Sequence, residues 1–303
     1  MTEKRPRRRQ KEYERFTLSQ RIEHAILMIS FTTLALTGLP QRYVGHPIAE
    51  TLILWLGGIE RTRQLHHVAA ITLGAVSAYH LIAAGYRYFV LGAKPRILPS
   101  LDDARYVLHE IAYFLCLRRE RPLADRYTYR EKLEYWAVVW GTFLMGLTGF
   151  MLWNPITVTR YLPGEIIPAA KAAHGLEAVL AVLSILMWHV YNVHLKHFNK
   201  SIFTGRITEE ELAHEHPLEL ARLRAGYEEK RPPTPVVRRR AALYVPIATI
   251  LLLFSVWGLY TFVTLEQTAL TTIPRRSTVT PYVPATPTPT PAGVTAQMPD
   301  TSK

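Results

Sequence analysis

Long apolar blocks separated by short polar stretches dominate the pattern of this chain. Each block has about 20 residues or more, which is the length that an α-helix needs to cross the hydrocarbon core of a bilayer. Arg and Lys bound the blocks, which disfavours buried helices of a large soluble protein. Five transmembrane helices are therefore predicted: Leu18–Leu39, Leu65–Leu91, Leu133–Trp153, Ile167–Leu195 and Ala241–Leu265.

The polar stretches divide the chain further. A short apolar helix at the outer membrane interface is predicted at residues 47–58, an amphipathic helix at 100–118, and a helix rich in Glu, Leu and Arg at 208–229. The C-terminal tail is predicted to be disordered because it is rich in Pro and Thr. The expected regions are a basic cytoplasmic tail at 1–17, a four-helix domain at 18–198, a cytoplasmic helix and linker at 199–240, the fifth transmembrane helix at 241–265 and an extracytoplasmic tail at 266–303.

The distribution of charge predicts the orientation in the membrane. Arg and Lys gather in the N-terminal segment, in the loop after the second block and in the segment after the fourth block. Basic loops stay on the cytoplasmic side, so the N-terminus is expected in the cytoplasm and the C-terminus outside. The net charge of +12 follows this topology. Membrane lipid is therefore an expected partner, and nucleic acid is not.

Histidines lie inside two of the apolar blocks, at matched depths. His66 and His80 are about 21 Å apart along one helix, and His174 and His189 about 22 Å apart along another. Each helix thus carries an imidazole near each face of the bilayer, where such a side chain indicates function. Facing histidines at two depths predict two stacked haems with axial imidazole ligands. His67 points about 100° away from His66, so His66 is the better ligand.

A further histidine, His24, lies about one turn into the first block, on the same side of the membrane as His189. A single histidine in such a block is as readily explained by a hydrogen bond to a neighbouring backbone group as by a haem. Five histidines at two matched depths favour haem. The sequence does not decide between these roles for His194, at the end of its block. The other histidines are expected to be solvated surface residues: His46, His109, His197, His214 and His216.

Cysteine usage limits the kind of cofactor. Cys116 is the one cysteine, so the chain has no internal disulfide and cannot hold an iron–sulfur cluster alone. The sequence has no Cys-x-x-Cys-His motif. Any haem is therefore expected to be haem b, without a covalent link.

The chain has an ordered set of short motifs: Arg21-Ile22-Glu23-His24, Leu36-Thr37-Gly38-Leu39, Leu65-His66, Thr148-Gly149, His174 and His189-Val190-Tyr191. Over about residues 18–220 the chain resembles the gamma subunit of membrane-bound formate dehydrogenases. That family of di-haem cytochromes b is grouped with those of thiosulfate reductases and nickel–iron hydrogenases. The resemblance implies an all-α integral membrane protein of the bacterial inner membrane, with a four-helix transmembrane haem-binding bundle. The fifth C-terminal transmembrane helix departs from the pattern.

The resemblance also assigns the iron ligands. It implies that His66 and His174 hold an outer haem and that His24 and His189 hold an inner haem. Helical spacing alone pairs His80 with His189 instead. We follow the resemblance, and His80 remains the alternate ligand of the inner haem.

The function implied is that of a quinone-reactive electron-transfer subunit of a respiratory oxidoreductase, and not of its catalytic subunit. Electrons would pass between menaquinone or ubiquinone and an extracytoplasmic iron–sulfur or multihaem cytochrome subunit, in a direction that the sequence leaves open. Quinone chemistry moves protons, so acid–base groups are expected beside the inner haem. The candidates are Tyr127, Glu131, Lys132 and Glu134.

Two other functions compete with this interpretation. Histidines and a buried carboxyl group also suit a transporter or a proton-conducting protein without haem. We disfavour it because the sequence has no evident repeated half and no helix interrupted at mid-membrane. A plain membrane anchor leaves the matched histidine depths without explanation.

Overall fold

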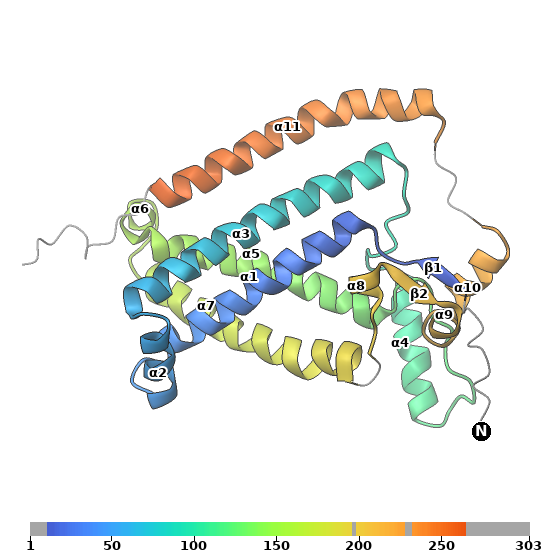
Figure 1. Cartoon of the computed structure of the whole chain (residues 1–303), viewed down its shortest axis with the longest axis horizontal. Helices are drawn as coiled ribbons and strands as arrows, with labels where there is room; N and C mark the ends of the chain where they lie inside the picture. The colour runs from blue at the N-terminus through green and yellow to red at the C-terminus, as the bar shows by residue number, and fades with distance from the viewer. Residues whose placement is uncertain (1–10, 196–197, 228–231, 265–303) are drawn as a thin grey trace, which may run out of the picture. The chain divides into compact units, whose positions relative to one another are not determined.

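A computed structural model describes residues 11–195, 198–227 and 232–264. Within these residues, five helices are long and apolar enough to cross a membrane. They are α1 (Leu18–Arg42), α3 (Ile59–Gly85), α5 (Tyr129–Trp153), α7 (Ile166–Ser184) and α11 (Thr234–Thr264) (Figure 1). α3 continues as the π-helix η1 (Tyr86–Val90) and α7 as the π-helix η2 (Ile185–Leu195).

The five predicted blocks coincide with these five helices, but three helices begin earlier than the apolar residues do. α5 begins at Tyr129 because the Thr128 side chain caps it, together with Glu131 in a capping box. α3 and α11 likewise extend into polar sequence, from Ile59 and Thr234. A hydropathy pattern finds the apolar centre of a helix and misses its polar first turns.

The apolar side chains of these helices point outward. At most 17% of the most apolar window of each helix is buried inside the protein. Leu183, Trp140 and Leu253, for example, are each about half exposed or more. Lipid is the medium in which such a surface is stable, so the chain is a multi-pass membrane protein.

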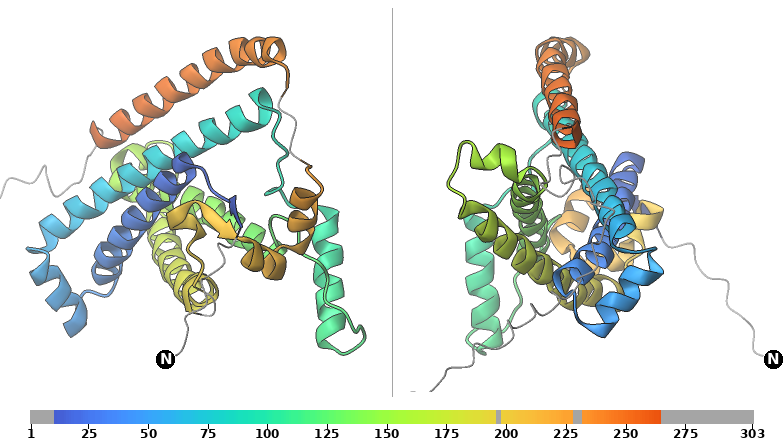
Figure 2. Two further views of the ribbon diagram at one scale, coloured as in Figure 1. Left: turned by 45° about the vertical axis from the view of Figure 1, so that its right-hand side comes forward. Right: turned by 90° about the vertical axis from the view of Figure 1, so that its left-hand side faces the viewer.

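The long helices pack in pairs. α1 lies against α3, α5 lies against α7, and α1 also contacts α7. α11 lies along α3 and η1, as both views of Figure 2 show. Tyr244 of α11 donates a hydrogen bond to the Ile82 carbonyl of α3, 2.6 Å away.

Shorter elements follow the long helices. The predicted interfacial helix is α2 (Pro47–Trp55), and the predicted amphipathic helix is α4 (Leu101–Phe114), with Ser100 at its N-cap. The helix predicted at 208–229 is instead two helices, α9 (Glu209–Glu215) and α10 (Pro217–Arg224). Pro217 disfavours a helical conformation for the residue before it, so the chain breaks at His216. The remaining short helices are α6 (Pro155–Thr159) and α8 (Ser201–Thr204).

A small cap covers the end of the molecule where α1 and α5 begin. Its strands β1 (Glu12–Glu14) and β2 (Arg206–Thr208) pair antiparallel, with Tyr13 opposite Ile207. Ile207, Leu212 and Leu220 form its buried apolar core. Residues 11–17 are therefore part of a folded unit and not wholly the tail expected from their charge. The predicted tail at 266–303 lies outside the described residues.

Candidate functional site

Two histidines face each other near the ends of α1 and α5. His66 lies in α3 and His174 in α7, with ring centroids 6.3 Å apart. Each ring is held at Nδ1 by a threonine hydroxyl: Thr37 Oγ1 lies 2.9 Å from His66, and Thr148 Oγ1 lies 2.9 Å from His174. We call these two histidines the outer pair.

The threonines also determine which nitrogen of each imidazole carries the proton. Thr37 donates its hydroxyl hydrogen to the Thr33 carbonyl at 2.6 Å, and Thr148 donates to the Leu144 carbonyl at 2.7 Å. Each hydroxyl is then left to accept from an imidazole Nδ1–H. Nε2 of both histidines therefore keeps its lone pair, which is what a metal ligand needs.

A glycine follows each of these threonines and makes room for the ring. A Cβ atom at Gly38 would lie 2.9 Å from Cε1 of His66, and one at Gly149 would lie 3.4 Å from Cε1 of His174. The first distance is too short for two carbon atoms. The Thr-Gly sequence thus supplies both an acceptor and a space for the imidazole.

A second pair of histidines faces across α1 and η2. The ring centroids of His24 and His189 are 6.4 Å apart. Nδ1 of His189 lies 2.9 Å from Oε2 of Glu134, a carboxylate of α5. We call His24 and His189 the inner pair. Since the carboxylate engages Nδ1, Nε2 of His189 is again available to a metal.

His80 has different neighbours from those that helical spacing predicted. Its Nδ1 lies 2.7 Å from Oε2 of Glu23, and its Nε2 lies 2.9 Å from the hydroxyl of Tyr135. Both ring nitrogens thus meet polar side chains of α1 and α5. The structure brings His24, and not His80, opposite His189.

These contacts form a repeat that the sequence analysis missed. Glu23 and His80 in α1 and α3 correspond to Glu134 and His189 in α5 and η2. Thr37 and His66 correspond in the same way to Thr148 and His174. The recurring Leu-Thr-Gly at 36–38 and 147–149 is the sequence signal that would have revealed it. Both halves begin at the cap, so the repeat is parallel and not the inverted repeat of many transporters.

The two halves differ at one informative position. His24 follows Glu23, whereas Tyr135 follows Glu134. The first half therefore supplies a histidine, His24, to the inner pair. At the equivalent position the second half has Tyr135, whose hydroxyl contacts His80.

Each of the four residues predicted to meet a quinone contacts another side chain in the described part of the chain. Lys132 Nζ is bound to the Asp103 carboxylate of α4 at 2.8 Å, and Glu134 contacts His189. Glu131 caps α5 and reaches Arg15, 3.4 Å away. The ring of Tyr127 lies under the Arg15 guanidinium, 5.3 Å from it.

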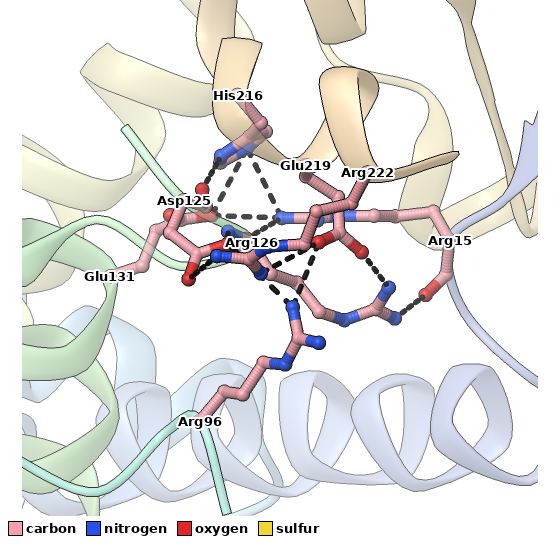
Figure 3. A network of polar contacts seen from close by, with 8 residues as sticks. All are labelled: Arg15, Arg96, Asp125, Arg126, Glu131, His216, Glu219 and Arg222. Carbon is pink, nitrogen blue, oxygen red and sulfur yellow. Dashed lines mark hydrogen bonds and ion pairs between the residues drawn. The ribbon is translucent and has the colours of Figure 1, made fainter. Parts of the chain in front are cut away.

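A polar network holds the cap to the loop before α5 (Figure 3). Arg222 of α10 binds both oxygens of Asp125, at 2.6 and 2.8 Å. Arg126 of the same loop and Arg96 from the segment between η1 and α4 both bind Glu219 of α10, at 3.1 and 2.8 Å. Segments far apart in the sequence thus meet through ion pairs, which no local pattern predicts.

His216 is part of this network and is buried, which corrects its predicted place on the surface. Its Nδ1 donates to the Asp125 carbonyl at 2.7 Å, and Arg15 donates to its Nε2 at 3.1 Å. Burial lowers the pKa of His216, and the positive charge of Arg15 lowers this pKa further. Burial alone would raise the pKa of Asp125, but hydrogen bonds from Arg222 and the backbone of Arg126 outweigh it and lower that pKa.

The two histidine pairs can each provide two opposite ligands to one metal. Among the described residues, no group of three or more side chains of His, Cys, Asp or Glu gathers to bind a metal ion. The remaining ligands would have to come from another source, such as the four nitrogens of a macrocycle.

Comparisons with known proteins show the family of this chain. The model of the family described as prokaryotic cytochrome b561 matches residues 15–205. The cytochrome b556(fdo) subunit of formate dehydrogenase from Escherichia coli K12 is 25% identical over 179 residues, which cover 58% of this chain and 76% of that protein. The counterparts from Escherichia coli strains CFT073 and O157:H7 match equally well. The family match spans both histidine pairs and all four helices that carry them, so the chain belongs to the prokaryotic cytochrome b561 family and is a membrane b-type cytochrome of electron transfer.

Proposed function

We propose that this chain is the quinone-reactive subunit of a membrane-bound respiratory oxidoreductase and holds two b haems. The outer haem would lie between His66 and His174, and the inner haem between His24 and His189. The observation that carries this proposal is the separation of the ring centroids, 6.3 Å in one pair and 6.4 Å in the other. An imidazole nitrogen binds a transition metal at about 2.0 Å and lies about 1.2 Å from the ring centroid, so two axial imidazoles on one metal have centroids about 6.4 Å apart.

The residues around each pair suit this role. Thr37, Thr148 and Glu134 each engage the Nδ1 atom of a facing histidine. Such outer partners orient the ring and make Nε2 a better ligand. When bound, haem accepts and releases one electron at a time, and burial and hydrogen bonding by the protein adjust its potential.

The proposed architecture is a four-helix haem-binding bundle of α1, α3, α5 and α7 with α11 added on the outside of α3. The cap and the basic loops would face the cytoplasm, because Arg and Lys concentrate there. The inner pair is then the one near the cytoplasmic surface. The outer pair would face an extracytoplasmic redox subunit, as the relationship to a formate dehydrogenase cytochrome suggests.

Electrons would enter or leave through a quinone of the membrane. Oxidation of a quinol yields two electrons and two protons, so its site must accept both. The involvement of Tyr127, Glu131, Lys132 and Glu134 stays a prediction. Their contacts with Arg15, Asp103 and His189 also support structural roles.

The test is a haem count on the purified chain. We expect a reduced-minus-oxidised spectrum of a b-type cytochrome and about two haems per chain by pyridine haemochrome. His24→Ala should remove one haem, and His66→Ala should remove the other. His80→Ala is the matched control and should keep both.

The opposite result is equally clear. Loss of a haem in His80→Ala but not in His24→Ala would show that His80, and not His24, is the ligand of the inner haem. A well-folded chain without haem would reject the proposal and leave transport or anchoring as the function.

A further inference from the structure

The last residue of α1 reaches across to the helix that carries one histidine of the outer pair. Arg42 ends α1, and its guanidinium packs on the backbone of α7 at Gly175, where a Cβ atom would overlap the Arg42 side chain. Gly175 is buried and directly follows His174. The positive charge of Arg42 therefore lies against the residue next to an outer histidine.

The face of α1 that carries Arg42 also meets the other histidine of the outer pair. Gly38 precedes Arg42 by four residues, and a Cβ atom at Gly38 would lie 2.9 Å from Cε1 of His66. Residues four apart share one face of a helix. Arg42 thus follows the contact with His66 by one turn, toward the end of α1 that lies away from the cap.

The positive charge of Arg42 has no carboxylate partner in the described part of the chain. Arg63 at the same end of the bundle pairs with Glu60 at 3.7 Å, whereas no described acidic side chain forms an ion pair with Arg42. The ring of Tyr43, 5.5 Å from the guanidinium, offers only a cation–π attraction. An arginine keeps its charge in a protein and binds a carboxylate through two parallel N–H groups. Arg42 is therefore suited to a carboxylate that the chain itself does not supply.

The proposed outer haem would bring such carboxylates to this place. Haem b carries two propionate groups on one edge of the macrocycle. An ionised carboxylate is far more costly in the apolar centre of the membrane than near its surface. The propionates of a haem between His66 and His174 are thus expected on the side away from the cap, which is the side of Arg42.

We propose that Arg42 binds a propionate carboxylate of the outer haem, and that Gly175 leaves the space through which the guanidinium reaches it. The proposal rests on the proposed function and adds an electrostatic contact to the outer haem site. Arg42 would hold the edge of the cofactor, while His66 and His174 hold its iron. Its charge would also neutralise the carboxylate, which otherwise favours the ferric over the ferrous state of the iron.

The first experiment changes the charge of Arg42. Arg42→Gln removes the charge, and Arg42→Lys keeps it without the planar fork. Arg61→Gln is the matched control, because Arg61 also packs on a glycine: a Cβ atom at Gly57 would lie 2.8 Å from its Cδ. Arg61 is about 140° around α3 from His66, so it points elsewhere. Each variant is purified in nanodiscs and its haem content is recorded, and His66→Ala identifies the signals of the outer haem.

Two measurements report on the outer haem without any turnover. Spectroelectrochemistry gives its midpoint potential, which should be lower in Arg42→Gln because the lost positive charge had favoured the ferrous state. Transfer of the outer haem to apomyoglobin should be about tenfold faster in this variant, as expected for the loss of a hydrogen bond to a charged group. Arg42→Lys should lower the potential less, and Arg61→Gln should behave as the unmodified chain.

An isotope label distinguishes a carboxylate contact from a general loosening of the site. Cells that are fed isotope-labelled aminolaevulinic acid make haem with labelled propionates, whose bands are followed in redox-difference infrared spectra. Arg42→Gln should shift these bands. Gly175→Ala should shift them as well, because the added carbon displaces the guanidinium, and should have no additional effect in the Arg42→Gln background.

Three results would overturn the proposal. Equal potentials and equal haem retention in Arg42→Gln and Arg61→Gln would show that Arg42 does not bind the outer haem. Faster haem loss with unchanged propionate bands would make Arg42 a structural contact between α1 and α7. An effect of Arg42→Gln in nanodiscs that contain phosphatidylglycerol, but not in those of phosphatidylcholine alone, would assign the bound anion to a phospholipid phosphate. Failure of the proposed function itself would be separate, since it would appear as missing haem in the unmodified chain.

Discussion

Single hydroxyl groups orient the histidines of the outer pair. Thr37 and Thr148 each donate to a carbonyl of their own helix and accept from an imidazole. Orienting partners of metal-bound histidines are typically worth 10- to 100-fold in affinity, that is about 1.4 to 2.7 kcal/mol. The same residue is therefore both a part of the helix and a part of the proposed haem site.

Replacement of Thr37 or Thr148 by valine should weaken the outer haem. The shape of the side chain is kept and the acceptor for Nδ1 is lost, so haem retention should fall about 10-fold or more on dilution or in a transfer assay to apomyoglobin. Thr33→Val is the control, because the Thr33 hydroxyl bonds the Ile29 carbonyl of its own helix. Equal haem retention in all three variants would contradict the role of the hydroxyls.

Gly38→Ala should displace the His66 ring, because the added carbon would lie 2.9 Å from Cε1. We expect loss of the outer haem while the inner haem remains, measured by pyridine haemochrome. Gly149→Ala is expected to be milder, since its contact is 3.4 Å. Gly146→Ala meets no atom within 4 Å and should be neutral or slightly stabilising, because Ala favours a helix. A Gly38→Ala protein with both haems would refute this argument.

At the residue scale, helical spacing predicted a partner for His80 that the structure does not give it. Spacing placed His80 opposite His189 by assuming 3.6 residues per turn. The chain widens into a π-helix from Ile185, which rotates His189 away from the direction that a regular α-helix gives it. The facing of His24 and His189 also depends on how α1 packs on η2, and such a distance between helices has no signal in the period of one helix.

At the scale of elements, the ion pairs of the cap join segments that are distant in the sequence. Capping boxes at Thr17 and Thr128 are local signals and place the starts of α1 and α5. The contacts of Asp125 with Arg222 and of Arg96 with Glu219 join residues about a hundred positions apart. Hydropathy and charge patterns therefore recover the helices and leave the cap undetected.

The cap should loosen as the pH falls. The pKa of His216 is lower in the folded protein than its usual value of about 6.5, so the unfolded cap binds the proton more tightly. The contribution of His216 to stability is then full above about pH 6.5 and decreases as the pH falls below that value. The surrounding charged groups are Arg15, Arg126, Glu131 and Glu219.

Hydrogen exchange of the backbone amides in β2 measures this effect, after correction for the intrinsic pH dependence of exchange. Protection should fall as the pH decreases below about 6.5 in the unmodified chain. In His216→Gln the amide side chain cannot take up the proton, so the pH dependence in this range should flatten. A dependence that is unchanged in this variant would assign the effect to another group.

For the whole molecule, the distribution of basic residues predicts that the cap lies in the cytoplasm. Cys116 is the one cysteine of the chain and is exposed after α4, on the cap side of the helices. A membrane-impermeant maleimide should therefore label it in inverted vesicles and not in intact spheroplasts. The reverse control is Cys116→Ser combined with Tyr161→Cys, because Tyr161 is 83% exposed in the loop between α6 and α7. Labelling of Cys116 in intact spheroplasts would invert the proposed orientation.

The parallel repeat has a consequence for how the protein is assembled. Each threonine–histidine contact lies within one half, whereas both facing pairs join a histidine of the first half to one of the second. In the proposed holoprotein, every cofactor is thus a crosslink between two helical hairpins. A chain without haem would lack these two links, and the halves would then be held together by the contact of α1 with α7 and by the cap.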